Sequence, residues 1–528
     1  MIRKHWPFIV LLVAVAVTRF AILFASQTHV TGDEAVVGLM AKHILEGRYF
    51  PFYPYGVPYN GSQAWEAYLA VVPFSIFGTG VVALKSSTVL LSLVCLVLFY
   101  LMTGRLFGYR MATLASAIFA LSPSLLKWHF QPRGYAFYFI DIPLLVLLFL
   151  VLESRERTSG KAAFLFGLAS GLSVWCLELI LPLLATLWAL LLLRRKFSIA
   201  MFAVAVAGFV AGYAPVIWWN FTHAFANWHF LFLEKPESAG LATRLGFNAW
   251  RDIFMVEMPK FFSADTVLWY YPETSWIGYV MYAVALVTVV AAAINALRWQ
   301  TIRNALRDGF ASTNSAADLL LLVLIAASFV PYCIAPLRVP GYFLAGAFFI
   351  SILIARLIHR CFTSSSKLAR AFGIGVILAV VVSGAGAMID TARHNQIETL
   401  TLCHGRSDHC MTRIPGADID AVKRYLGDHQ IEAVWTSISF TYPLIFETGE
   451  RLIASESIFG VDRPVYPPEI PKPEPTSYNR AVFVIETDSP YRPEIEQTCA
   501  QKGGAAPVVN EFGKLTVIEQ RFASEMNR

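Results

Sequence analysis

Long apolar runs, separated by short polar segments, make up most of the chain. A helix needs about 20 apolar residues to cross the hydrocarbon layer of a bilayer, and only a helix satisfies its own backbone hydrogen bonds there. Eleven runs meet this requirement approximately, and they cover residues 6–25, 81–103, 109–127, 138–152, 161–177, 179–193, 198–219, 276–297, 317–335, 341–358 and 371–389. The pattern predicts a polytopic α-helical membrane protein with about eleven transmembrane helices.

Two of these runs, 161–177 and 179–193, are short and adjoin at Leu177 and Glu178. By hydropathy alone they could form one long helix. Lys161 and Arg194, at the two far ends, both belong in the cytoplasm, because Lys and Arg are enriched in cytoplasmic loops. We therefore expect two spans with an outer turn between them.

Charged residues stand between the apolar runs. The 528 residues are 56% hydrophobic and 15% charged, with a net charge of +6. Alternate loops carry the basic residues, which are Arg3 and Lys4; Arg105 and Arg110; Arg155, Arg157 and Lys161; Arg194, Arg195 and Lys196; Arg298, Arg303 and Arg307; and Arg356, Arg360, Lys367 and Arg370. Because these residues lie at span ends and not on one polar domain, the charge indicates membrane topology and no nucleic-acid partner.

The same charge asymmetry predicts the orientation. The basic loops are expected in the cytoplasm, and the aromatic and acidic loops 26–80, 128–141 and 220–275 on the outer side, together with the tail after Asp390. This predicts a multi-pass protein of the inner (plasma) membrane with a cytoplasmic N-terminus and a periplasmic, or otherwise extracytoplasmic, C-terminal domain. Residues 6–25 follow basic residues as in a secretion signal, but no small-residue cleavage site follows, so we expect a retained first helix.

The first outer loop, 26–80, is expected to have structure of its own. Glu34–Glu46 has helical periodicity, Tyr49–Pro58 is a turn rich in Pro and Tyr, and Ala64–Phe77 has the pattern of an amphipathic helix ending at Gly78. Such a helix should lie along the membrane surface, where it can meet a substrate carried in the lipid.

After Asp390 the composition becomes that of a soluble domain. Helices are expected at Asp418–Leu426, Tyr442–Glu447 and Glu494–Gln501, and strands at Ala433–Thr436, Ala481–Glu486 and Leu515–Glu519. This alternation predicts a small soluble α/β domain over 391–528, following a membrane module over 1–390. Within it, Pro464–Pro475 has six prolines in twelve positions and is expected to be an extended excursion.

Three of the seven cysteines lie outside the apolar runs and their flanks. Cys403 and Cys410 bracket His404, Asp408 and His409, a composition that suits a zinc site. In an oxidising compartment a local disulfide between the two cysteines is the alternative, and either interpretation leaves Cys499 unassigned.

The sharpest chemical signal follows the first predicted helix. Thr31, Gly32, Asp33 and Glu34 place two acids just beyond its outer end, and ionisable groups at the edge of a membrane bundle are costly unless they are paired or used. Asp33 could act as a catalytic carboxylate. Alternatively, it could cap the helix that runs through His43, because acidic residues stabilise helix N-termini.

Further polar residues are expected on the same outer surface. They are Glu66 in the first outer loop, Lys85 at the outer end of the second span, Arg133, Tyr135 and Asp141 in the second outer loop, and Arg338 and Tyr342 at the outer end of the tenth span. Each could be only an interfacial anchor or a snorkelling cation. Together they would place carboxylates and cations around one outward cavity.

That combination suits the transfer of a sugar from a lipid phosphate. The reaction needs a carboxylate that takes the acceptor's proton, and cations or a metal that stabilise the departing phosphate. Asp33 fits the base, and the cations Lys85, Arg133 and Arg338 fit the phosphate.

The first loop also resembles that of a known superfamily, the GT-C glycosyltransferases, and in particular the protein O-mannosyltransferases and the lipid A aminoarabinose transferases. The resemblance covers roughly residues 6–390 and rests on Asp33 and Glu34, Ala41, Gly47, Pro58 and Tyr59, Glu66 to Tyr68, and Phe77 and Gly78, with Gly104 to Gly108 similar to the cytoplasmic turn after the family's second helix. It implies a polyprenyl-phosphate-linked sugar donor and an inverting transfer on the outer face to a glycan, lipid or protein acceptor.

Residue by residue, the resemblance implies that Asp33 is the catalytic acid, with Glu34 its neighbour and Asp141 the acid after the second outer loop. Glu66 stands where the aminoarabinose transferases hold a metal-binding Glu, which implies a divalent metal ion. Those enzymes continue with Lys-Pro, whereas this chain does not. Their later metal-binding His has no clear match here: His229 is the nearest candidate, and the resemblance places Lys235 at the equivalent position.

Two other classes of function stay open. A transporter or lipid flippase would have the same topology, but it should show ionisable residues or broken helices at mid-membrane in paired repeats, and the best candidate, Glu178, falls at a predicted outer turn. A non-catalytic scaffold of the cell envelope would use the tail as its interaction module. It would leave the outer-loop acids without a shared purpose.

Overall fold

The computed structural model describes residues 2–26, 29–154, 159–194, 198–233, 246–262, 276–334, 340–393, 396–402, 409–455 and 482–520. These residues form two compact units. The first, here called the membrane unit, comprises residues 1–22, 59–65 and 88–390. The second, called the loop–tail unit, comprises residues 23–58, 66–87 and 391–528.

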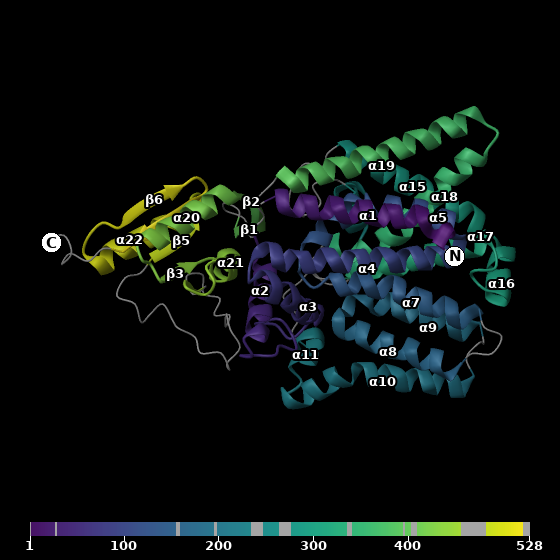
Figure 1. Cartoon of the computed structure of the whole chain (residues 1–528), viewed down its shortest axis with the longest axis horizontal. Helices are drawn as coiled ribbons and strands as arrows, with labels where there is room; N and C mark the ends of the chain where they lie inside the picture. The colour runs from purple at the N-terminus through teal and green to yellow at the C-terminus, as the bar shows by residue number, and fades with distance from the viewer. Residues whose placement is uncertain are drawn as a thin grey trace. The chain divides into compact units, whose positions relative to one another are not determined.

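Eight helices among the described residues are long and apolar enough to cross a membrane. They are α1 (Ile2–Ala25), α4 (Val81–Phe107), α7 (Ala136–Ser154), α10 (Ile199–Thr222), α15 (Trp276–Ala296), α17 (Asn314–Ile334), α18 (Leu344–Thr363) and α19 (Lys367–Arg393) (Figure 1). Each coincides with a predicted span, so the protein is a multi-pass membrane protein.

The predicted span at 109–127 is broken. α5 (Tyr109–Ala120) is followed by α6 (Pro123–Leu126) and the 3-10 turn η1 (Lys127–Phe130), and the two segments meet at 70°. Pro123 explains the break, because a proline disfavours helical backbone at the residue before it, and Ser122 is accordingly extended at ψ 117°. The predicted span is thus a bent pair of helices, which together are long and apolar enough to cross a membrane.

The two short apolar runs are separate helices, as expected. α8 (Gly160–Cys176) ends at an extended Leu177, the 3-10 turn η2 (Glu178–Ile180) follows, and α9 (Leu181–Leu193) continues the chain. In one straight helix, Ser170 and Trp188 would lie about 27 Å apart. Instead the Trp188 indole donates a hydrogen bond to the Ser170 hydroxyl at 3.3 Å, so α9 folds back along α8.

Four glycines bring α8 and α10 together. Gly167 and Gly171 on α8 face Gly208 and Gly212 on α10, and a Cβ added at any of them would come closer than 3.0 Å to backbone atoms of the other helix. The two backbones therefore touch directly. Pairs of small residues four apart allow this packing inside membranes, where burial from water does not drive association.

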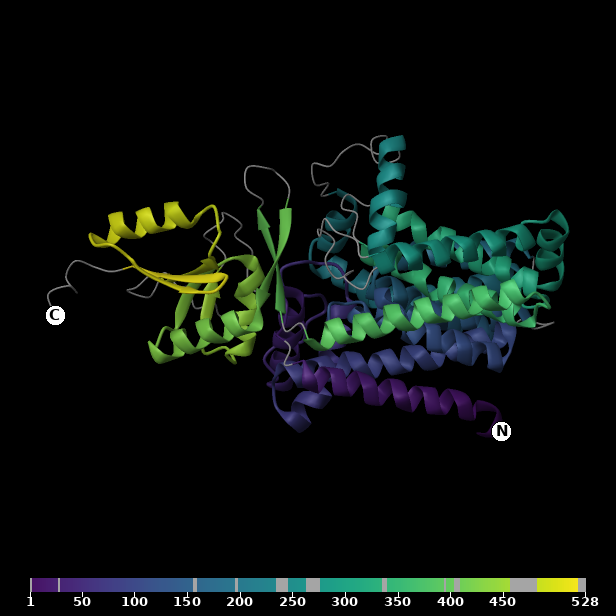
Figure 2. The same ribbon diagram turned by 90° about the horizontal axis from the view of Figure 1, so that it is seen from above.

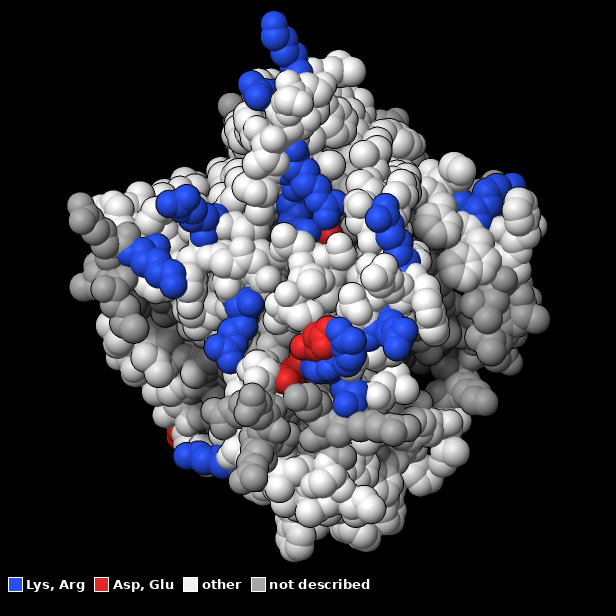
Figure 3. All heavy atoms as spheres, turned by 90° about the vertical axis from the view of Figure 1, so that its right-hand side faces the viewer, with Lys and Arg blue, Asp and Glu red and all other residues white. Residues whose placement is uncertain are grey.

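Basic side chains cover one end of the membrane unit, at which Figure 1 labels N, α16 and α17 (Figure 3). α16 (Trp299–Asp308) was not predicted from the sequence. It contains Arg303 and Arg307, and Arg298 is its N-cap residue, so all three predicted basic residues of this loop belong to the helix or its start. Inside this end, the Arg194 guanidinium lies 2.9 Å from the buried Glu153 carboxylate. The same carboxylate accepts a hydrogen bond from the backbone amide of Phe310. This ion pair therefore joins residues of two separate loops between the spans.

The C-terminal part of the chain is the expected small α/β domain. Its strands are β3 (Ala433–Thr436), β4 (Ile453–Ser455), β5 (Val482–Glu486), β6 (Val508–Phe512) and β7 (Leu515–Glu519), in the sheet order β4-β3-β5-β7-β6. β3 pairs in parallel with both β4 and β5, and the other pairs are antiparallel. β1 (Gln396–Leu402) and β2 (His409–Pro415) form a separate antiparallel hairpin. β1, β2, β4 and β6 were not predicted.

Three helices cover this sheet, and the alternation of side chains along the strands explains how. Val484 and Val517 point to the face packed by α20 (Gly416–Asp428) and α21 (Ile438–Glu447), whereas Ile485 and Ile518 contact α22 (Arg492–Gly503). Figure 2 shows α22 on the opposite side of the sheet from the other two helices. The segment Pro464–Pro475, Cys403 and the side chain of Cys410 lie outside the described residues, and Cys499 is a buried free thiol on α22.

The first loop folds together with this domain. α2 (Gly32–Leu45) and α3 (Ser62–Phe77) contribute Val37, Leu39 and Phe74 to a hydrophobic core that also contains Val422 and Phe446. α2 lies directly against α21, because a Cβ on Gly38 would clash with the Phe446 ring.

α3 confirms the predicted helix but not its amphipathic pattern. Its inner residues Ala67 and Phe74 are buried, yet its outer residues Val72 and Ile76 are 58% and 67% exposed and equally apolar. The amphipathic prediction was therefore wrong, because both faces of the helix are apolar.

Candidate active site

Asp33 and Glu34 lie in the first turn of α2 but in different surroundings. Thr31 is the N-cap residue, and its backbone is extended at φ −81° and ψ 173°. The Glu34 carboxylate accepts a hydrogen bond from the Thr31 backbone amide at 2.7 Å. Glu34 is 1% exposed, whereas Asp33 is exposed. Glu34 thus closes the helix start. Thr31 and not Asp33 is the N-cap residue, and Asp33 lies in the first turn, where an acidic residue stabilises the helix.

Lys85, in the N-terminal part of α4, neutralises Glu34. Its ammonium lies 3.3 Å from the second Glu34 oxygen and donates to the backbone carbonyl of His29 at 2.8 Å. Both side chains are almost fully buried, so this ion pair is part of the packed structure. The predicted role of Lys85 in binding phosphate stays a prediction, since two intramolecular partners already engage this ammonium.

The exposed Asp33 carboxylate therefore stands apart from the buried pair. It lies beside the N-terminal end of the α2 dipole, which stabilises negative charge. An accessible carboxylate that is held on a rigid helix suits proton abstraction from an arriving group.

In the membrane unit, three of the predicted residues come together. The Arg133 guanidinium lies 5.8 Å from the Trp128 ring centroid, and Tyr135 packs edge-on against the same ring at 4.5 Å. Burial, followed by the neighbouring phenols of Tyr342 and Tyr59, raises the pKa of Tyr135 well above its ordinary value. Tyr135 therefore stays protonated and can donate a hydrogen bond.

Asp141 lies in α7 (Ala136–Ser154), six residues after Tyr135. It is 8% exposed and packs against Ser173 and Cys176 of α8. One of its carboxylate oxygens is buried without a hydrogen-bond partner among the described residues. Arg338, the third predicted phosphate ligand, lies outside the described residues.

The predicted metal ligands do not form a visible site. Glu66 is fully buried in α3, and His229 is exposed at the start of the π-helical turn η3 (His229–Leu233). Across the part of the chain that the structure describes, no three His, Cys, Asp or Glu side chains lie close enough together to hold one ion. Lys235 lies outside that part. We therefore derive no step through a metal.

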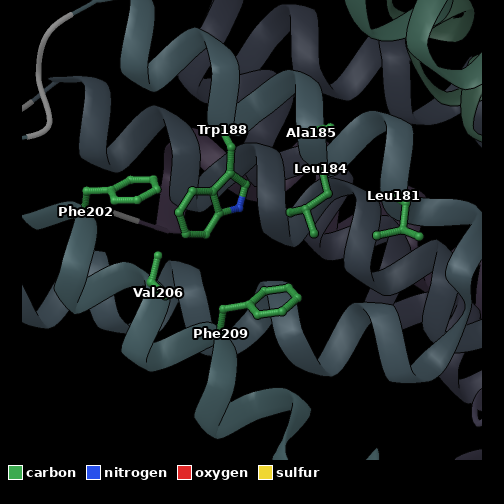
Figure 4. A pocket seen from close by; sticks show the side chains of 7 residues that line it. All are labelled: Leu181, Leu184, Ala185, Trp188, Phe202, Val206 and Phe209. Carbon is green, nitrogen blue, oxygen red and sulfur yellow. The ribbon is translucent and has the colours of Figure 1, made fainter.

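An apolar groove of about 320 Å³ opens between α9 and α10 (Figure 4). Trp188 of α9 and Phe202 and Phe209 of α10 project into it, and its remaining lining residues are Leu181, Leu184, Ala185 and Val206. It contains no ionisable group and cannot host the proposed chemistry.

Sequence reasoning missed three pairs of polar side chains. His29 pairs with the Glu447 carboxylate at 2.7 Å, and His43 with the Glu450 carboxylate at 2.9 Å. In the membrane unit, the buried Arg19 of α1 contacts His129 at 2.9 Å. The histidines and carboxylates of the first two pairs are about 400 residues apart in sequence, so no local pattern could have joined them.

Comparison with solved structures identifies the architecture. ArnT from Cupriavidus metallidurans, crystallised with undecaprenyl phosphate, aligns with a TM-score of 0.61 and 14% identity over 98% of each chain, and its apo form aligns with a TM-score of 0.58 over 97% of this chain and 98% of that one. AglB, an oligosaccharyltransferase from Archaeoglobus fulgidus, aligns with a TM-score of 0.48 and 13% identity over 86% of this chain and 64% of that one. No family model and no curated protein sequence matches the chain. The predicted GT-C architecture is confirmed as the fold.

Proposed function

We propose that the protein is an inverting glycosyltransferase that moves a sugar from a polyprenyl-phosphate-linked donor to an acceptor on the outer face of the membrane. The observation that carries this proposal is the exposed Asp33 carboxylate at the start of α2, beside the buried Glu34–Lys85 pair. A buried, neutralised acid next to an exposed one gives the two carboxylates different tasks, of which only the exposed one can reach a substrate.

The fold supports the same class of reaction. Solved structures of this fold include ArnT bound to undecaprenyl phosphate, a lipid carrier. The donor and the acceptor class, whether glycan, lipid or protein, belong to the proposal, as do the outer-side location of residues 391–528 and the assignment of 1–390 as the catalytic membrane module.

In the proposed reaction, the Asp33 carboxylate takes a proton from the acceptor's hydroxyl or amine. The acceptor atom forms a bond to the anomeric carbon while the bond from that carbon to the phosphate oxygen breaks, and the configuration inverts. The departing polyprenyl phosphate carries the electron pair and is stabilised by cations, for which Arg133 and Arg338 are the candidates, with Tyr135 and Tyr342 as hydrogen-bond donors. Asp141 is the candidate for orienting a substrate hydroxyl.

Release of polyprenyl phosphate by the purified full-length protein tests this function. A panel of polyprenyl-phosphate sugars is offered with membrane extract as the source of acceptor, and the wild type is compared with Asp33→Asn. We expect turnover with one donor, a loss of about 100-fold or more in Asp33→Asn, since general-base catalysis contributes about that much, and unchanged donor binding.

The alternatives give different results. If the folded wild type turns over no donor of a broad panel, the protein is better explained as a transporter or a scaffold. If Asp33→Asn keeps full turnover, another residue is the base and the proposed mechanism fails.

A further inference from the structure

The segment that leads to Asp33 is fixed by the C-terminal domain. The Glu447 carboxylate accepts a hydrogen bond from the Val30 amide at 3.1 Å through one oxygen and contacts the His29 ring nitrogen Nδ1 at 2.7 Å through the other. Lys423 of α20 also binds this second oxygen at 2.7 Å. One carboxylate therefore ties together two neighbouring residues of the first loop and a helix of the domain.

The same short segment is held from its other side. Lys85 binds the carbonyl of His29, and Glu34 binds the amide of Thr31, so residues 29, 30 and 31 each have a backbone group fixed by a buried charged side chain. His29, Val30 and Thr31 are all less than 9% exposed. Asp33 follows two residues later.

Glu447 is poorly placed for the stability of its own helix. It is the last residue of α21, where the helix dipole disfavours negative charge, and its side chain is only 5% exposed. Burial alone would raise the pKa of Glu447, but hydrogen bonds from His29 and Lys423 lower it below its ordinary value. The His29 contact thus both favours the ionised form of this carboxylate and holds the first loop.

We propose that Glu447 is a positioning residue: through His29 and Val30 it fixes the turn that orients the Asp33 carboxylate, so the C-terminal domain takes part in catalysis by holding the catalytic segment. This inference rests on the proposed function. A misplacement of about 1 Å in a catalytic group can cost about 100-fold in rate, so an anchor this close to Asp33 should affect turnover.

The chain contains a matched control. Glu450, three residues further on, binds His43 at 2.9 Å and also pairs with Lys42. It too joins the domain to α2 through a histidine, but His43 is ten residues after Asp33, about 15 Å along the helix. Both substitutions, Glu447→Gln and Glu450→Gln, remove one histidine-paired carboxylate charge, at a side chain 5% exposed in Glu447 and 15% exposed in Glu450. Only the first should disturb the turn.

The first readout is turnover of the full-length protein with the donor found for the wild type. We expect Glu447→Gln to lower kcat by about 10- to 100-fold with KM for the donor changed less than about twofold, and Glu450→Gln to change both by less than about twofold. Equal losses in the two variants would mean that the contacts only hold the domain together and would overturn the proposal.

The second readout needs no turnover. Hydrogen exchange at the Val30 and Thr31 amides should accelerate in Glu447→Gln and not in Glu450→Gln, and unchanged exchange in Glu447→Gln would overturn the proposal. If Glu447→Gln does not fold, Glu447→Asp, which keeps the charge and withdraws it by one methylene, is used with the same two readouts and the same criteria.

The two ideas fail in different ways. An active wild type whose turnover and exchange are insensitive to Glu447 refutes the positioning role and leaves the glycosyltransferase proposal standing. A wild type without turnover on any donor refutes the proposed function, and with it the catalytic part of this inference.

Discussion

The glycine contact between α8 and α10 allows a quantitative prediction for Gly171→Ala. An added Cβ would lie 2.7 Å from the backbone nitrogen of Tyr213, and closer still to the carbonyl oxygen of Phe209, whereas ordinary contacts begin at 3.4 Å. Because both obstacles are backbone atoms, no side chain can rotate away. The two helices must separate by about 1 Å.

The energetic cost follows from that separation. A gap of 0.5–1 Å forfeits about a quarter to a half of each dispersion contact that it opens, and overpacked cores lose about 1–3 kcal/mol. Alanine is favoured over glycine in a helix by about 1 kcal/mol, which offsets part of this loss. We expect a net loss of up to about 2 kcal/mol in the free energy of unfolding.

Unfolding of the purified protein in mixed micelles with increasing SDS measures this difference. Gly375→Ala is the matched control, because Gly375 lies in the transmembrane helix α19 and no atom lies within 4 Å of its added Cβ. The control should unfold at the wild-type SDS fraction or slightly above it. If Gly171→Ala unfolds at that same fraction, direct backbone contact between α8 and α10 is not what holds them.

Two further predictions concern charged groups. Arg194→Met leaves the buried Glu153 carboxylate without the guanidinium that now pairs with it, so the same SDS titration should show a loss of about 3–5 kcal/mol, and an unchanged midpoint would mean that this pair is not desolvated. Burial opposes the charge of Glu450, but its hydrogen bonds to His43 and Lys42 lower its pKa, so its contribution is complete above the ordinary value of 4.5 and declines as the pH falls below it. Melting curves of Glu450→Gln should therefore lie below those of the wild type at pH 7 and approach them between pH 4.5 and 3, and a constant difference over that range would refute this linkage.

The membrane helices were predictable because hydropathy acts locally. All eleven apolar runs correspond to helices, including the separation at Leu177, where loop charges decided what hydropathy could not. The bend at Pro123 was also predictable, because a proline disfavours helical backbone at the residue before it, but the prediction did not include this bend. The Gly167–Gly171 and Gly208–Gly212 spacings were likewise visible, although nothing in the sequence paired the two helices.

The candidate site was predictable only in part. The sequence pointed to Asp33 and Glu34, but their division into an exposed and a buried acid depends on Lys85, which is about 50 residues away and reaches Glu34 only in the folded chain. In the tail, β3 and β7 were predicted to the residue, because each is a compact β-branched or aromatic run. β4 has only three residues, and in β6 the adjacent polar residues Asn510 and Glu511 break the apolar run, so neither stands out.

The mixed core of the loop–tail unit also sets an order of assembly during synthesis. Val37 and Leu39 of α2 are made early, but their partner Phe446 follows Phe74, the last buried first-loop residue of this core, by about 370 residues. At roughly 5–20 residues per second, the ribosome needs about 20–70 s to cover that distance. Throughout this interval the first loop has an apolar surface with no completed core, so Asp33 acquires its final surroundings only after α21 has been made.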